Sequence, residues 1–210
     1  MGTLKTTLIP ASRKPAAGLF IMLHGLGDSL DGCRWIPDAM NLPELSFLLV
    51  NAPDRYFTGY AWYDFTGDIL AGVERSRQLL FELLNQQIAA GFPPEKIVLA
   101  GFSQGCLMSI EVGLRFPQLL AGIVGISGYV ADPQKLLNSL SPLATRQQLL
   151  ITHGLLDPII PFVFALDQIR LLQNASINIQ WHEFMKAHII AGEPEIAVIR
   201  EFVKARLGLP

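Results

Sequence analysis

A serine between two glycines is the residue in this sequence best suited to chemistry. Residues 101–105 read Gly-Phe-Ser-Gln-Gly, after the short apolar run 97–100 and before a stretch with a helical pattern. This is the setting of a nucleophile elbow, a sharp strand-to-helix turn that lifts the hydroxyl of Ser103 clear of the backbone. Gly101 and Gly105 would leave room for that turn to pack. The alternative is a glycine-flanked turn without a chemical role.

A serine nucleophile needs a base, and the chain has four histidines. His24 and His153 each precede a glycine in a predicted tight loop, and His182 lies inside a predicted strand. His188 follows the last apolar run, in a loop. A neutral imidazole can take the serine proton at neutral pH and return it to the leaving group. We therefore expect His188 to be the base, with His182 as the alternative.

An acid that orients the base is expected at Asp157. It follows the apolar run 149–152 and lies in a loop bounded by Pro158 and Pro161. Such an acid holds the imidazole in the correct tautomer and stabilises the imidazolium. With Asp157, the reactive residues follow the chain order Ser, Asp, His of α/β-hydrolases. The alternative is an aspartate that only caps the turn or the next helix.

Backbone N–H groups are expected to stabilise the oxyanion. Residues 24–28 read His-Gly-Leu-Gly-Asp at the end of the apolar run 19–23, and such a turn can present an N–H to a developing negative charge. The N–H groups of Leu26 and Gln104 are the candidates, each worth about 10²–10³ in rate. Because the donors are backbone groups, both side chains are expected to matter little. His24 is expected to hold the loop.

The reactive residues all follow short apolar runs, which predict buried strands. Helical patterns lie between these runs. One helix carries Val73, Leu80, Leu84 and Ile88 on one face and ends near Gly91, and two others cover residues 162–172 and 194–208. The alternation predicts a single α/β domain over residues 1–210, with a mostly parallel central sheet and helices on both faces. Reactive groups gather at the C-terminal ends of such strands. The predicted strands are residues 19–23, 47–50, 97–100, 121–126, 149–152 and 177–183.

The composition excludes several classes of protein. Half of the 210 residues are apolar and 16% are charged, which excludes intrinsic disorder. The net charge of −2 and the absence of a Lys/Arg run make nucleic acid an unsuitable partner. Cys33 and Cys106 are too few for a disulfide framework and lack metal-ligand spacing, so both are expected to pack as apolar residues. No apolar stretch is long enough for a signal peptide or a membrane span, and a cytoplasmic protein is expected.

Four segments together resemble the acyl-protein thioesterase/lysophospholipase-like carboxylesterase family. They are residues 24–28, residues 101–105, residues 157–161 (Asp-Pro-Ile-Ile-Pro) and His188. Three further segments support the resemblance, which spans roughly residues 18–207. They are Asn-Ala-Pro at 51–53, Trp-Tyr-Asp at 62–64 and Ser-Gly-Tyr at 127–129.

The resemblance implies an α/β-hydrolase fold with little or no cap domain. It also implies hydrolysis of acyl esters or thioesters with no cofactor and no metal, on a small-molecule or acylated substrate. Transient contact with lipid and a homodimer are compatible with it. The chain has Cys106 and Ala187 where the family usually has Gly and Gly or Met, respectively. It is also short between Pro53 and Trp62, where an acyl chain would bind, so substrate length stays open.

The candidate substrate-binding residues are mostly aromatic. Six aromatic residues fall within positions 56–65, and they could form one wall of an apolar acyl pocket. The alternatives are that they fill the core or form a subunit interface. Asp64, in the same segment, is expected to tie down its own loop. The substrate-binding candidates are Trp62, Tyr63, Phe65, Tyr129 and Ile159.

The sequence therefore predicts a serine carboxylesterase that works through an acyl-enzyme. Ser103 is the expected nucleophile, His188 the base and Asp157 the orienting acid. One alternative is a non-catalytic binding module with the same fold. Another is the same triad used for amide hydrolysis or for acyl transfer to peroxide.

Overall fold

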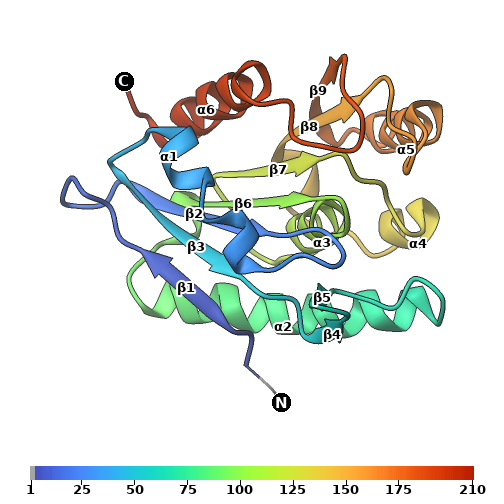
Figure 1. Ribbon diagram of the computed structural model, residues 1–210, viewed down its shortest axis with the longest axis horizontal. Helices are drawn as coiled ribbons and strands as arrows, with labels where there is room; N and C mark the ends of the chain where they lie inside the picture. Colours follow the sequence, from blue (N-terminus) through green and yellow to red (C-terminus); the bar gives the residue numbers. More distant parts are fainter. Residues whose placement is uncertain (1–2) are drawn as a thin grey trace.

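The computed structural model describes residues 3–210 and contains a seven-stranded sheet (Figure 1). The strand order is β1-β3-β2-β6-β7-β8-β9. β1 pairs antiparallel with β3, and the other neighbouring strands are parallel. The strands are β1 (Thr6–Ile9), β2 (Gly18–Leu23), β3 (Leu45–Val50), β6 (Ile97–Phe102), β7 (Gly122–Ile126), β8 (Gln148–Gly154) and β9 (Asn178–Phe184).

Helices cover both faces of this sheet (Figure 1). α1 (Ile36–Met40) and α6 (Glu193–Leu207) pack on one face. The other face carries α2 (Ile69–Ala89), α3 (Gln104–Gly113), α4 (Pro133–Leu137) and α5 (Phe162–Asn174). A hairpin of β4 (Asp54–Tyr56) and β5 (Gly59–Ala61) lies between β3 and α2. Short 3-10 turns lie at Leu30–Cys33, Pro94–Lys96 and Ala144–Arg146.

The two helical layers explain why the central strands are continuous apolar runs. Side chains alternate between the faces of a strand. In β2, Leu19 and Ile21 join the core beneath α2 and α3, whereas Phe20 and Met22 join the core beneath α1 and α6. A strand covered on both faces therefore consists mostly of apolar residues.

The six predicted strands are confirmed, with ends that differ by one or two residues. β8 extends to Gly154, so His153 lies in a strand and not in the predicted loop. β1 was not predicted. Its four residues alternate between exposed and half-buried positions at the edge of the sheet, so it lacks the apolar run of the central strands. The predicted α/β architecture, with a mostly parallel sheet and helices on both faces, is confirmed.

Candidate active site

Ser103 lies in the turn between β6 and α3 with φ 55° and ψ −115°. A non-glycine residue at positive φ is strained and persists only where its surroundings enforce it. The two flanking glycines allow the turn to pack, as predicted. A Cβ on Gly101 would lie 2.0 Å from the Gly105 carbonyl oxygen, and one on Gly105 would lie 2.2 Å from the Leu23 carbonyl oxygen.

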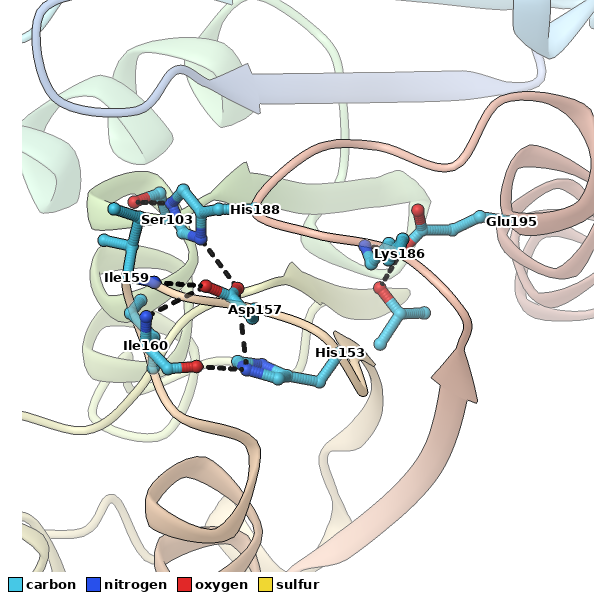
Figure 2. A network of polar contacts seen from close by, with 9 residues as sticks. Ser103, His153, Asp157, Ile159, Ile160, Lys186, His188 and Glu195 are labelled. Carbon is cyan, nitrogen blue, oxygen red and sulfur yellow. Dashed lines mark hydrogen bonds and ion pairs between the residues drawn. The ribbon is translucent and has the colours of Figure 1, made fainter.

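The imidazole of His188 lies between the side chains of Ser103 and Asp157 (Figure 2). Its Nε2 is 2.9 Å from Ser103 Oγ, and its Nδ1 is 2.7 Å from Asp157 Oδ2. The His188 ring also packs against Phe102, with ring centroids 5.0 Å apart. Nδ1 donates to the carboxylate, which leaves the lone pair of Nε2 facing the serine hydroxyl. The sequence-predicted nucleophile, base and acid thus lie within hydrogen-bonding distance of one another.

Asp157 is buried and held by backbone donors (Figure 2). Its Oδ1 accepts hydrogen bonds from the N–H groups of Ile159 and Ile160, both at 2.9 Å. Burial by itself would raise the pKa of this carboxyl. The Ile160 N–H, the His188 ring and the Ile159 N–H outweigh burial and lower the pKa. Asp157 is therefore an anion in contact with the imidazole.

His153 lies next to Asp157, on the side away from Ser103 (Figure 2). Its Nε2 is 2.9 Å from the Ile160 carbonyl oxygen and 3.7 Å from Asp157 Oδ2. The ring stacks on Trp181, with an interplanar angle of 15°. Burial lowers the pKa of His153, so the ring is neutral, with its proton on the Nε2 that faces the carbonyl. His153 therefore fixes the loop that carries the acid.

His24 holds the loop after β2, as predicted. Its Nε2 accepts from the Ala52 N–H at 3.0 Å, and its Nδ1 lies 2.6 Å from the Gly25 carbonyl oxygen. Gly25 lies against the elbow, because a Cβ there would be 3.3 Å from Ser103 Cβ. Within residues 3–210, the hydrogen bonds of the protein use neither the Leu26 N–H nor the Gln104 N–H. Both oxyanion candidates are thus available as donors.

The side chain of Gln104 has a structural role, and the prediction that it matters little is wrong. Its amide is buried, accepts from the Trp62 N–H at 2.9 Å and donates to the Tyr63 carbonyl oxygen at 3.0 Å. Two backbone groups that would otherwise be buried without partners are satisfied in this way. The residue after the nucleophile therefore joins the elbow to the segment after β5.

Trp62 and Tyr63 lie in the core and do not form the wall of an open acyl site. Their side chains are 0% and 1% exposed. Trp62 Nε1 donates to the His24 carbonyl oxygen at 2.9 Å, and the Tyr63 hydroxyl lies 2.9 Å from that of Tyr129. Each of these side chains buries its ring in the core, and its one polar atom has a hydrogen-bonding partner. The prediction of substrate contact at these two residues is corrected accordingly.

The other substrate-binding candidates lie at or near the surface. The Ile159 side chain is 68% exposed, and its N–H is one of the two that hold Asp157 in place. Phe65 is half-exposed and packs against Tyr56, and Tyr129 is half-buried next to Phe164. Phe57, at the tip of the β4–β5 hairpin, is 89% exposed. The aromatic segment therefore divides between the core and the surface.

The remaining predicted residues have structural roles. Asp64 Oδ1 accepts from the N–H and the hydroxyl of Thr66, as expected of a residue that ties down its own loop. Cys33 and Cys106 are free and buried, and burial raises the pKa of both thiols to about 12. His182 is exposed on β9 and lines a surface groove beside α6.

Two features are absent from the described part of the chain. Residues 3–210 contain no group of three His, Cys, Asp or Glu side chains placed to hold a metal ion. None of the helices in that range is long and apolar enough to cross a membrane.

One ion pair near the site was not predicted. The Lys186 ammonium lies 2.5 Å from Glu195 Oε1, and both side chains are almost fully buried (Figure 2). Burial lowers the pKa of Lys186, although Glu195 opposes that shift. The sequence offers no signal for this pair. From the sequence alone, Lys186 cannot be distinguished from a solvated loop residue, or Glu195 from any acid in the first turn of a helix.

Comparisons with known proteins agree on one family. The family described as phospholipase/carboxylesterase matches residues 4–207. Acyl-protein thioesterase 1 of Schizosaccharomyces pombe is 31% identical over 205 residues, which cover 90% of this chain and 91% of the relative. The crystal structure of esterase PE8 has a TM-score of 0.86 at 28% identity and covers 97% of this chain and 99% of that one. Acyl-protein thioesterase 2 of Zea mays shares the fold, with a TM-score of 0.80 at 22% identity over 97% of this chain and 99% of that one.

Replacing Gln104 by alanine should destabilise the fold. The substitution keeps the backbone N–H but leaves the buried Trp62 N–H and Tyr63 carbonyl unpaired, which costs about 1–3 kcal/mol for each lost partner. Urea unfolding measures the change. Gln134→Ala is the control, since that side chain is exposed on α4 and donates to the exposed side chain of Asn138. Equal stability of the two variants would contradict a structural role for the Gln104 amide.

The free energy of unfolding should fall as the pH falls from about 7 to about 5. Burial lowers the pKa of His24 and of His153 in the folded protein. In the unfolded chain these imidazoles titrate near about 6.5. Below that pH the unfolded state binds protons that the folded state does not, so folding loses free energy.

His153→Gln tests this pH dependence. The variant should be less stable at neutral pH but should show a shallower slope of stability against pH, by up to about 1.4 kcal/mol per pH unit. His182→Gln, at an exposed site, should keep the wild-type slope. Urea unfolding at several pH values gives both slopes. Identical slopes for wild type and His153→Gln would contradict a neutral buried ring.

Proposed function

The chain belongs to the phospholipase/carboxylesterase family, and from this membership we propose that it is a serine hydrolase that cleaves acyl esters or thioesters through Ser103, His188 and Asp157. The observation that carries the proposal is the hydrogen-bonded series from Ser103 Oγ through His188 to Asp157, at 2.9 and 2.7 Å. The strained turn that presents Ser103 supports it. The relatives named acyl-protein thioesterase and esterase support the choice of substrate.

In the first half of the reaction, Ser103 Oγ attacks the acyl carbonyl carbon while His188 Nε2 removes the hydroxyl proton. The carbonyl oxygen gains the negative charge, and the N–H groups of Leu26 and Gln104 donate hydrogen bonds to it. The anionic Asp157 stabilises the imidazolium and keeps its Nδ1–H in place. Collapse of the tetrahedral intermediate breaks the bond to the alcohol or thiol, which leaves with the proton from His188.

In the second half, water replaces the leaving group. His188 Nε2 removes a proton from water, and the hydroxide attacks the ester that joins the acyl group to Ser103. The same two N–H groups stabilise the second oxyanion. Breakdown of this intermediate releases the carboxylic acid and returns the proton to Ser103 Oγ. The cycle uses water, three side chains and two backbone N–H groups of one chain, which we propose to act as a single domain.

Ser103→Ala should abolish hydrolysis of a p-nitrophenyl ester, with a loss of at least about 10³-fold in kcat/KM. A serine-directed fluorophosphonate should label the wild type with one equivalent and should not label the variant. Circular dichroism establishes that the variant is folded. Retention of most of the turnover in folded Ser103→Ala would overturn the assignment. A wild type that neither turns over nor reacts would favour the binding module.

The base is tested with a matched pair of histidine variants. His188→Ala should lose about as much activity as Ser103→Ala, because residues of one triad act as a unit. His182→Ala should retain wild-type kcat/KM, since His182 lies exposed on β9. The reverse result would move the base to His182.

Three apolar side chains next to Asp157 in the sequence are exposed, namely Leu155, Leu156 and Ile159. They support a preference for long acyl chains. For p-nitrophenyl esters of about two to sixteen carbons, kcat/KM should rise by up to fourfold per methylene, since burial of a methylene contributes about 0.8 kcal/mol. Ile159→Ser, which keeps the backbone N–H to Asp157, should flatten this series and leave the acetate rate unchanged. A maximum at the shortest esters would contradict an open apolar site.

A further inference from the structure

The carboxylate of Glu195 binds both ends of the loop that carries His188. Oε1 lies 2.5 Å from the ammonium of Lys186, two residues before His188. Oε2 accepts from the N–H of Ala191 at 2.6 Å, three residues after His188. Thr152, two residues before the end of β8, donates its hydroxyl to Oε1 at 2.5 Å and so joins the carboxylate to the sheet. We call this arrangement the Glu195 clamp.

A helix-capping role does not account for the clamp. The Glu195 carboxylate accepts from the N–H of Ala191, which lies before the N-cap residue Gly192, and α6 has no side-chain cap. The approach of Lys186 brings a second charge into the protein interior, with side chains 1% and 0% exposed. Desolvating two charges costs several kcal/mol, and their attraction repays this only with good geometry and further hydrogen bonds. The pair is therefore stable only together with the bonds from Ala191 and Thr152, which join it to the loop and to β8.

The loop needs external support because its own backbone provides little. Within residues 186–191 the backbone bonds are the short contact from Ile189 N–H to the Ala187 carbonyl, and, at the Lys186 end, bonds to Phe184 and Leu156. His188 lies in the middle, and its ring must meet Ser103 and Asp157 on two different loops. A shift of about 1 Å in such a group can cost on the order of 10²-fold in rate.

On the basis of the function proposed above, we propose that Glu195 is a positioning residue that holds the His188 imidazole in line with Ser103, and that Lys186 completes the clamp by fixing the N-terminal end of the loop. Neither side chain can touch substrate, because both are buried. The clamp acts through the backbone of residues 186–191. It should therefore affect the proton-transfer steps and leave substrate binding as it is.

Lys186→Met tests the clamp with the least change in shape. It removes the ammonium but leaves Glu195 with the Ala191 and Thr152 donors. We expect kcat to fall by about 10- to 100-fold and KM to stay within a factor of two. The rate of fluorophosphonate labelling of Ser103, which needs the base but no substrate, should fall by a similar factor. The far-downfield proton resonance of His188 Nδ1–H should broaden.

A second buried ion pair provides the control. Arg115 pairs with Glu111 at the far end of α3, with side chains 7% and 5% exposed. Arg115→Met should lower the midpoint of thermal unfolding about as much as Lys186→Met, without a change in kcat of the folded protein. An equal loss of kcat in both variants would mean that the loss reflects lower stability and not the position of His188, and it would overturn the proposal.

A double-mutant cycle with Glu195→Gln measures whether the two residues act together. If Lys186 and Glu195 act as a pair, removing either one already releases the loop. The double variant should then lose much less activity than the product of the two single losses. Multiplicative losses would overturn the pairing. If Lys186→Met does not fold, Thr152→Val removes one donor from Glu195 without leaving a charge. An unchanged kcat in that variant would then count against the clamp.

The outcomes separate the clamp from the function on which it rests. Hydrolysis that is retained in Ser103→Ala would contradict the proposed hydrolase mechanism. Activity that depends on Ser103 but is unchanged by Lys186→Met removes the clamp alone.

Discussion

The rest of the structure depends on one close approach of backbone at the elbow. The chain can turn from β6 into α3 only where Gly101 and Gly105 let carbonyl groups approach to distances that a side chain would forbid. Ser103 takes a backbone conformation that costs of order 1–3 kcal/mol. Burial of α3 against the sheet and the bond from the Ser103 N–H to the Ile126 carbonyl offset that cost. Every other part of the site is placed relative to this fixed point.

Two layers of polar groups surround the elbow. The inner layer is the series Ser103, His188 and Asp157, and Asp157 is its anion. The outer layer consists of groups that hold the inner ones, namely neutral His153 under the acid and the charged pair of Lys186 and Glu195 under the base. The neutral state of the His153 ring is important, because a cation beside Asp157 would compete with His188 for the carboxylate.

The sequence predicts the inner layer well and the outer layer poorly. Parallel strands bring their C-terminal ends to one edge, so reading the residue after each apolar run identifies Ser103, Asp157 and His188 as neighbours. The edge strand β1 and the buried positions of Trp62 and Tyr63 depend on which segment covers which, and a local pattern does not contain that information. The Gln104 amide and the Lys186–Glu195 pair depend on contacts over 41 and nine positions of chain. The residue types of Gln104, Lys186 and Glu195 do not indicate which distant group each one contacts.

All ten residues of α3 are buried. A helix enclosed in this way cannot fray into solvent on its own, so its amide hydrogens should exchange with water only when the whole domain opens. The same holds for Ser103, the proposed nucleophile, which is the N-cap residue of α3. The position of Ser103 is therefore lost only together with the fold.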